Sequence, residues 1–201
     1  MTTKPILWDL PMPIRTPRLT IMPAAAGMGQ GMYDAVMETQ PQLREWFGWA
    51  HKDPTPDGYE EIMREEGAKF AMRKDFMLLA FDKNNKMIGS TGFHPINQFE
   101  TPVVHIGYWC RQSEQGKGYV TEIVNGLTRY AFDVMNLKKV SIHIAQENAA
   151  SIAVAERTGF PLEYTSRFGA LRPHTNELTT LNVYSRFDTN GLPPLDVSWG
   201  L

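Results

Sequence analysis

The chain has 201 residues, of which 42% are hydrophobic and 21% are charged, and its formal net charge is −2. This length fits one domain that can bury a proper core, and the composition is typical of a soluble globular protein. The small net charge argues against a general affinity for nucleic acid, which needs a clear basic excess, although it leaves room for a local basic patch.

The single cysteine, Cys110, excludes an internal disulfide and a cysteine-rich zinc site. We therefore expect a reducing, cytoplasmic location. Residues 1–9 have no apolar core and carry Asp9, so they are not expected to act as a signal peptide. No apolar run approaches the ~20 residues that a membrane-spanning helix needs, and we expect no membrane partner.

Prolines crowd the first 17 residues and predict an extended lead-in. The hydrophobic spacing then alternates between helical and strand-like periods. Helices are predicted at residues 33–39, 42–49, 57–74, 116–135 and 148–157, and strands at 18–22, 76–82, 86–93, 103–110, 139–145, 162–168 and 177–187. Thr55 is expected to cap the third helix and Gly159 to end the last one.

The tail, residues 189–201, is expected to lie over the surface. The element order predicts one domain over residues 1–201, with its core at about residues 16–187. The fold class is mixed α/β, one mixed sheet with helices on its faces.

The segment Gly116-Lys117-Gly118 follows a strand and a polar loop and opens a helix. Glycines let backbone N–H groups converge, and the start of a helix favours negative charge. The segment therefore predicts a pyrophosphate cradle. A Walker A loop is excluded because Lys117 is followed by glycine, and a dinucleotide fingerprint is excluded because Thr121 replaces its third glycine. A tight turn without a ligand remains an equal alternative for the glycine pair alone.

Four separated motifs resemble the GNAT superfamily of N-acetyltransferases, and most closely the branch typified by the ribosomal-protein enzymes RimJ and RimL. The resemblance covers about residues 16–187, and Ser113 departs from the family pattern, which has Gln or Arg at that position. The motifs are Thr16-Pro-Arg-Leu19, Leu43-Arg-Glu-Trp46 with Trp49, Gly107-Tyr108-Trp109 followed by Gly116-Lys117-Gly118-Tyr119-Val120-Thr121-Glu122, and Asn148-Ala-Ala-Ser151 followed by Ala155-Glu-Arg-Thr-Gly-Phe160.

The resemblance implies a GNAT fold, a single mostly antiparallel mixed sheet that splays at the cofactor site between residues 103–110 and 139–145, with helices on both faces. It implies direct transfer of an acetyl group from acetyl-CoA to a primary amine, without a metal. The leading acceptor is a protein N-terminal α-amine. The alternatives are a small amine, such as a polyamine, an amino acid or an antibiotic, and a module that binds acyl-CoA without turnover. A homodimer is also expected from relatives.

The resemblance also implies the residues that contact the cofactor. Asn148 is as well explained by a helix N-cap and Arg157 by an exposed helix end. Ser151 is expected near the CoA sulfur, where its hydroxyl would support the leaving thiolate; an ordinary serine is the alternative. The expected cofactor-binding residues are Trp109, Cys110, Arg111, Gln115, Gly116, Lys117, Gly118, Tyr119, Val120, Asn148, Ser151 and Arg157.

His105 is the best candidate for the base that accepts a proton from the amine, because its ordinary pKa of about 6.5 suits proton transfer near neutrality. A partly buried strand histidine is the alternative, and Glu100, Glu163 and His94 are weaker candidates. Cys110 is disfavoured as a nucleophile, because its odd spacing from His105 puts the two on opposite strand faces.

Trp46 and Trp49 lie in the helices that shape the acceptor cleft in this branch, although core packing explains them as well.

Overall fold

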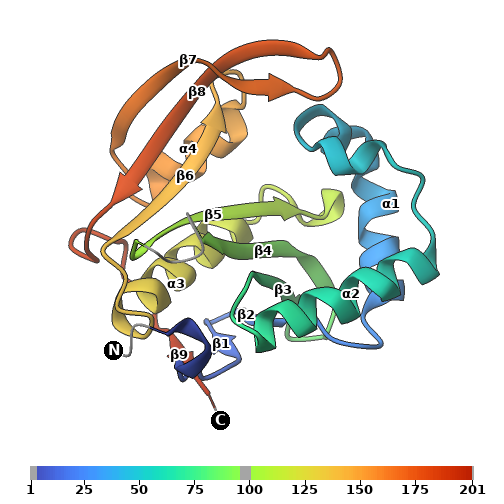
Figure 1. The fold of residues 1–201 in the computed structure, drawn as a ribbon, viewed down its shortest axis with the longest axis horizontal. Helices are drawn as coiled ribbons and strands as arrows, with labels where there is room; N and C mark the ends of the chain where they lie inside the picture. The colour runs from blue at the N-terminus through green and yellow to red at the C-terminus, as the bar shows by residue number, and fades with distance from the viewer. Residues whose placement is uncertain (1–3, 96–100, 201) are drawn as a thin grey trace.

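The computed structural model describes residues 4–95 and 101–200. Its strands join in one nine-stranded sheet in the order β7-β8-β6-β5-β4-β3-β2-β1-β9 (Figure 1). The strands are β1 (Ile14–Arg15), β2 (Leu19–Pro23), β3 (Phe76–Asp82), β4 (Met87–Pro95), β5 (Val103–Cys110), β6 (Lys139–Ala145), β7 (Leu162–Arg172), β8 (Glu177–Arg186) and β9 (Ser198–Trp199). The α-helices are α1 (Gly29–Trp46), α2 (Pro56–Ala71), α3 (Tyr119–Asp133) and α4 (Ala149–Arg157), with short 3₁₀ helices η1 (Pro5–Leu7), η2 (Gly48–His51) and η4 (Gln112–Glu114).

The sheet is mostly antiparallel, as expected. Among the strand pairs that the structure describes, only β5 and β6 run parallel. These two strands lie near the middle of the sheet, with α3 as the crossover between them. The crossover places the start of α3 at the carboxyl end of β5, the edge of a sheet where ligands of open α/β folds bind.

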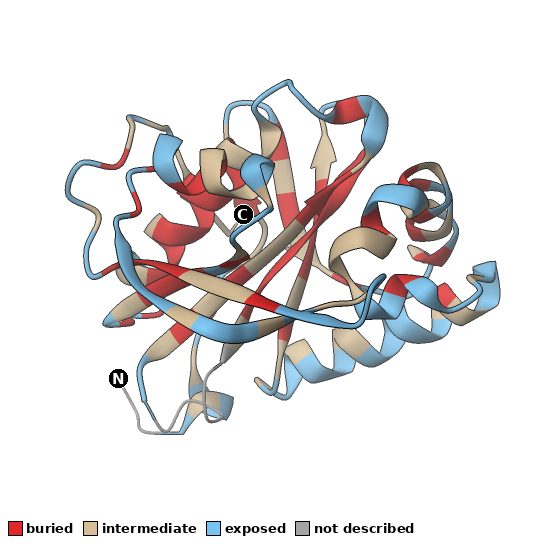
Figure 2. Cartoon of the chain, turned by 90° about the horizontal axis from the view of Figure 1, so that it is seen from above, coloured by how far each residue is buried: buried red, intermediate tan, exposed pale blue. Residues whose placement is uncertain are grey.

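Helices cover both faces of the sheet. Alternating residues of β3 show this: Leu78 and Ala80 pack into the core under α3 and α4, whereas Leu79 packs into the core under α1 and α2. The central strands are largely buried, and the outer surface of α2 is exposed (Figure 2). The predicted mixed α/β sheet with helices on its two faces is therefore confirmed.

Several local signals are confirmed. The hydroxyl of Thr55 accepts the Gly58 N–H at 3.0 Å and caps α2. Gly159 follows α4 with a φ of 67°, the left-handed conformation that ends a helix.

The structure corrects the prediction of two separate helices at residues 33–39 and 42–49. A single helix, α1, runs unbroken through Pro41. Proline removes one helical hydrogen bond, but residues on both sides of it, such as Val36 and Leu43, bury one continuous apolar face.

The tail does not merely lie over the surface, because Ser198 and Trp199 form β9 and pair with β1. The Trp199 ring packs edge-on against Tyr130 in α3, with ring centroids 5.8 Å apart.

Candidate active site

Strands β5 and β6 separate where the family resemblance implied a splay. Their ladder ends at the pair His105 and Ser141, and beyond it both strands line a cavity of about 1050 Å³. That volume lies just above the usual range for ligand sites, about 300–1,000 Å³. The cavity wall includes most of the predicted cofactor residues: Trp109, Cys110, Gln115, Gly116, Gly118, Tyr119, Val120, Asn148, Ser151 and Arg157.

The glycine loop opens α3 at one end of this cavity. Gly116 and Gly118 have φ values of 74° and 78°, which are left-handed conformations that glycine adopts without strain. The amide of Glu122 makes a helical hydrogen bond to the carbonyl of Gly118 at 3.1 Å. The preceding amides of the first turn therefore have no acceptor within the helix, and they are available to an anion.

A buried carboxylate holds the loop in place. Glu122 accepts hydrogen bonds from the Thr16 hydroxyl at 2.6 Å and from the Arg18 amide and Nε at 2.9 and 2.6 Å. The Arg18 guanidinium also donates to the carbonyl of Lys117 at 2.8 Å and lies over the Tyr119 ring. Two motifs more than 100 residues apart in the sequence therefore act together to fix the conformation of the glycine loop.

We expect Glu122→Ala to lower the free energy of unfolding by about 1.5–3 kcal/mol, because hydrogen bonds to a charged group contribute that much and Arg18 would lose its partner. Denaturant unfolding measures this change. Glu61→Ala, on an exposed part of α2, is the control and should stay within about 0.5 kcal/mol of the wild type. An equally small effect of Glu122→Ala would show that the network does not hold the loop.

Helix α1 is tied to the loop between β5 and α3. Glu38 accepts the amide of Ser113 at 2.7 Å and pairs with Arg111. Burial alone would raise the pKa of Glu38, but the hydrogen bonds from Ser113 and Arg111 lower the pKa to about 2. Arg111 is thus engaged with α1, and Lys117 pairs with Glu114 at 2.8 Å. Neither Arg111 nor Lys117 lines the cavity, although both were expected to contact the cofactor.

A pair of hydroxyls stands on the cavity wall between β5 and α4. Asn148 caps α4 by accepting the Ser151 amide at 3.1 Å. The Ser151 hydroxyl lies 2.7 Å from the Tyr108 hydroxyl, and burial raises the pKa of Tyr108 to about 12. Tyr108 was missed as a site residue, because the sequence does not show that β5 and α4 face each other.

Three imidazoles form a row across β4, β5 and β6. Asp75 lies 3.2 Å from the Nδ1 atom of His94, and the His94, His105 and His143 rings follow with centroids 5.0 Å apart at each step. The predicted base, His105, is the middle ring, and it is not part of the cavity wall. Burial first, and then its two histidine neighbours, lower the pKa of His105 to about 4.

His143 lines the cavity instead, and sequence analysis did not select it. The alternation of side chains along β5 predicted which face His105 occupies. It did not predict which residue of β6 lies beside it, because that depends on the order of the strands.

The remaining candidates lie elsewhere. Glu163 pairs with Lys139, and Glu100 lies outside the described residues. Burial raises the pKa of the Cys110 thiol to about 11, so this thiol keeps its proton near neutrality. Trp46 lines the cavity, whereas Trp49 packs near Trp109 with ring centroids 6.4 Å apart.

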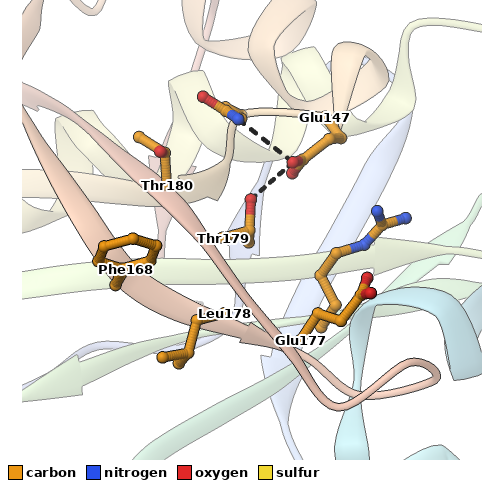
Figure 3. Close-up of a pocket in the computed structure, with 8 residues that line it drawn as sticks. Glu147, Phe168, Glu177, Leu178, Thr179 and Thr180 are labelled. Atoms are coloured by element: carbon orange, nitrogen blue, oxygen red, sulfur yellow. Dashed lines mark hydrogen bonds between the residues drawn. The ribbon is translucent and has the colours of Figure 1, made fainter.

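A smaller cavity of about 220 Å³ lies beside β7 and β8 (Figure 3). The carboxylate of Glu147 points toward Thr179, whose hydroxyl donates to it at 2.6 Å. This cavity has about a fifth of the volume of the first, and the predicted residues do not line it. The larger cavity is therefore the candidate site.

Within residues 4–95 and 101–200, no helix has both the length and the apolar character needed to cross a bilayer. In the same part of the chain, no three His, Cys, Asp or Glu side chains gather in an arrangement that would hold a metal ion.

Curated relatives include several acetyltransferases. The chain is 27% identical over 136 residues to the putative ribosomal N-acetyltransferase YdaF of Bacillus subtilis (strain 168). The aligned residues cover 68% of this chain and 74% of YdaF. It is 31% identical over 90 residues to the ribosomal-protein-serine acetyltransferase of Escherichia coli (strain K12), 45% of this chain and 48% of that protein. It is 37% identical over 67 residues to the spermidine N(1)-acetyltransferase of Vibrio cholerae serotype O1, 29% of this chain and 39% of that protein.

Solved structures show the same fold. The self-immunity acetyltransferase MccE, solved with acetyl-CoA and AMP, has a TM-score of 0.79 at 22% identity, covering 86% of this chain and 93% of MccE. RimL in complex with coenzyme A has a TM-score of 0.78 at 21% identity, covering 86% of this chain and 96% of RimL. The acetyltransferase (GNAT) domain matches residues 18–161, well over half of the chain. The protein therefore belongs to the GNAT family of acetyltransferases.

Proposed function

We propose that this protein transfers the acetyl group of acetyl-CoA directly to a primary amine, and that the preferred acceptor is the N-terminal α-amine of a protein. The observation that carries the proposal is the cavity between the separated strands β5 and β6. It joins the glycine loop at the start of α3 to the hydroxyl pair of Tyr108 and Ser151.

The residues present fit acetyl-CoA. The free amides at the start of α3 would hold the pyrophosphate. Because Gly116 and Gly118 have no side chains, the pyrophosphate can come close to these amides. The backbones of β5 and β6 beyond His105 and Ser141 no longer pair with each other, so they can hydrogen-bond the pantetheine arm. When bound, acetyl-CoA supplies the thioester whose carbonyl carbon the amine attacks.

The Tyr108 and Ser151 hydroxyls are proposed to act on the leaving group. Because the pKa of Tyr108 is about 12, its phenol keeps its proton and can donate a hydrogen bond to the Ser151 oxygen. The proton of Ser151 is then free to point into the cavity, toward the sulfur as the thiolate departs.

The charges of the cavity favour a monoamine over a polyamine. Two carboxylates, Glu45 and Glu114, are part of its described wall, and Glu114 is already paired with Lys86 and Lys117. A polyamine carries several ammonium groups and needs several carboxylates, whereas an α-amine brings one positive charge. The relatives that act on ribosomal proteins support the same acceptor, and the spermidine acetyltransferase resembles a smaller part of the chain.

A panel of amines tests this proposal. We expect release of free CoA thiol with peptides that have an unblocked N-terminus, and slower release with polyamines, free amino acids and aminoglycosides. N-terminally blocked peptides of the same sequence are the control. Faster turnover of a small amine would show that small amines are the preferred acceptors. Binding of acetyl-CoA without release of CoA thiol would favour a non-catalytic module.

A further inference from the structure

We infer that His143, and not His105, takes the proton from the acceptor ammonium, an inference that rests on the proposed transfer to an amine. An α-amine is largely protonated near neutrality, and only its neutral form attacks a carbonyl carbon. The base must therefore be reachable from the cavity. His143 lines the cavity and is partly exposed to solvent, whereas His105 stacks against it and is not part of the cavity wall.

The position of His143 follows from the register of the strands. His105 and Ser141 form the last ladder pair of β5 and β6. His143 lies two residues further along β6, on the same face, and is the first side chain of that face beyond the point of separation. Continuing the register would bring Gly107 opposite His143, and both residues line the cavity. A Cβ at Gly107 would lie only 3.0 Å from the Nε2 atom of His94, so the glycine leaves room for the His94 ring beside this part of the cavity.

Hydrogen bonds through Ser141 favour the tautomer of His143 that leaves Nδ1 without a proton. The Ser141 hydroxyl donates to the carbonyl of Val104 at 3.3 Å. Its oxygen, lying 3.3 Å from the Nε2 atom of His143, is then left to accept a hydrogen bond. In this arrangement neutral His143 carries its proton on Nε2, and the lone pair of Nδ1 can accept a proton from the acceptor.

Partial burial, helped by one neighbouring ammonium, favours the neutral form of this imidazole. Partial burial first, and then the Lys139 ammonium, lower the pKa of His143, and Glu163 opposes them. The stacked ring of His105 is itself neutral across the physiological range, since its pKa is about 4. On the other side of His105, His94 pairs with Asp75, and the charge of Lys69 also lowers the pKa of Asp75. Near pH 7 His143 is thus ready to accept a proton.

The proton balance is closed by solvent. The Nδ1 lone pair of His143 takes one proton from the ammonium, and the exposed imidazolium returns that proton to water. The freed electron pair of the amine forms the C–N bond while the C–S bond breaks. The second proton lost from the nitrogen ends on the sulfur, so the products are the amide, CoA thiol and one proton in solution.

The test is the pH dependence of kcat/KM for His143→Gln with an N-terminal peptide. Glutamine can still donate to Ser141 but does not accept a proton in this range. At pH 7 we expect a fall of at least about 100-fold. The acidic limb should move from below the ordinary histidine value of about 6.5 to the ionisation of the amine itself, at about 7.7–8.0. His51→Gln, in η2 and outside the cavity, is the matched control and should change neither quantity.

A second readout does not depend on turnover. In ¹⁵N-labelled wild-type protein, NMR should show neutral His143 as the Nε2–H tautomer, and Ser141→Ala should reduce that preference. Calorimetry of acetyl-CoA binding to His143→Gln shows whether the variant is folded. An unchanged pH profile with turnover within threefold of the wild type, or an Nδ1–H tautomer, would overturn the role of His143. A wild-type protein that acetylates no amine would instead overturn the proposed function, whatever the tautomer.

Discussion

Gly118→Asp is expected to weaken acetyl-CoA binding by at least about tenfold and to leave the fold intact. A carboxylate at the start of α3 would oppose the pyrophosphate, an effect of up to about 2 kcal/mol, and the left-handed φ of 78° would add strain of about 1–2 kcal/mol. The new Cβ would also lie 3.5 Å from the Arg18 guanidinium, drawing that group toward the carboxylate. Titration calorimetry measures the affinity.

Gly191→Asp is the matched control. Gly191 has a similar φ of 75° but lies outside the cavity wall, so its variant should carry the strain and keep the affinity. Unchanged binding by a folded Gly118→Asp variant would show that the pyrophosphate does not bind at the glycine loop.

Ser151→Ala is expected to lower kcat by about 10²-fold or more, with little change in acetyl-CoA affinity. A positioned proton donor contributes about 10²–10⁴-fold to such a reaction, and the hydroxyl is proposed to act on the departing sulfur, not on the bound nucleotide. Steady-state kinetics and calorimetry separate the two effects. A change in kcat of less than threefold would show that Ser151 has only a structural role.

Tyr108→Phe tests how Ser151 is oriented. If the phenol acts through the serine, the loss from Tyr108→Phe should largely disappear when Ser151 is already alanine. The control is Tyr164→Phe, whose ring is half exposed on β7, and it should have no effect. Additive losses in the double variant would show that the two hydroxyls act independently.

The glycine loop was predictable because its signal is local. The strand, the two glycines and the helix follow one another in the chain, and the left-handed backbone of Gly116 and Gly118 is one that glycine favours by itself. The cap at Thr55 was predictable for the same reason.

Contacts between distant segments were not predictable from single residues. Glu122 looks like an ordinary first-turn acid in the sequence, and only the fold shows that Thr16 and Arg18 meet it. The separation of β5 from β6 was expected from family resemblance. The neighbours of His105, however, depend on strand order, and the sequence alone therefore left His143 unnoticed.

The most direct test of the central claim uses one peptide with both an unblocked N-terminus and an internal lysine, incubated with the protein and acetyl-CoA. Tandem mass spectrometry then locates the acetyl group. We expect it on the α-amine, with CoA thiol released in equal amount and the lysine left unmodified. An unmodified peptide after thiol release from acetyl-CoA, or acetylation of the lysine alone, would contradict an enzyme that acetylates protein N-termini.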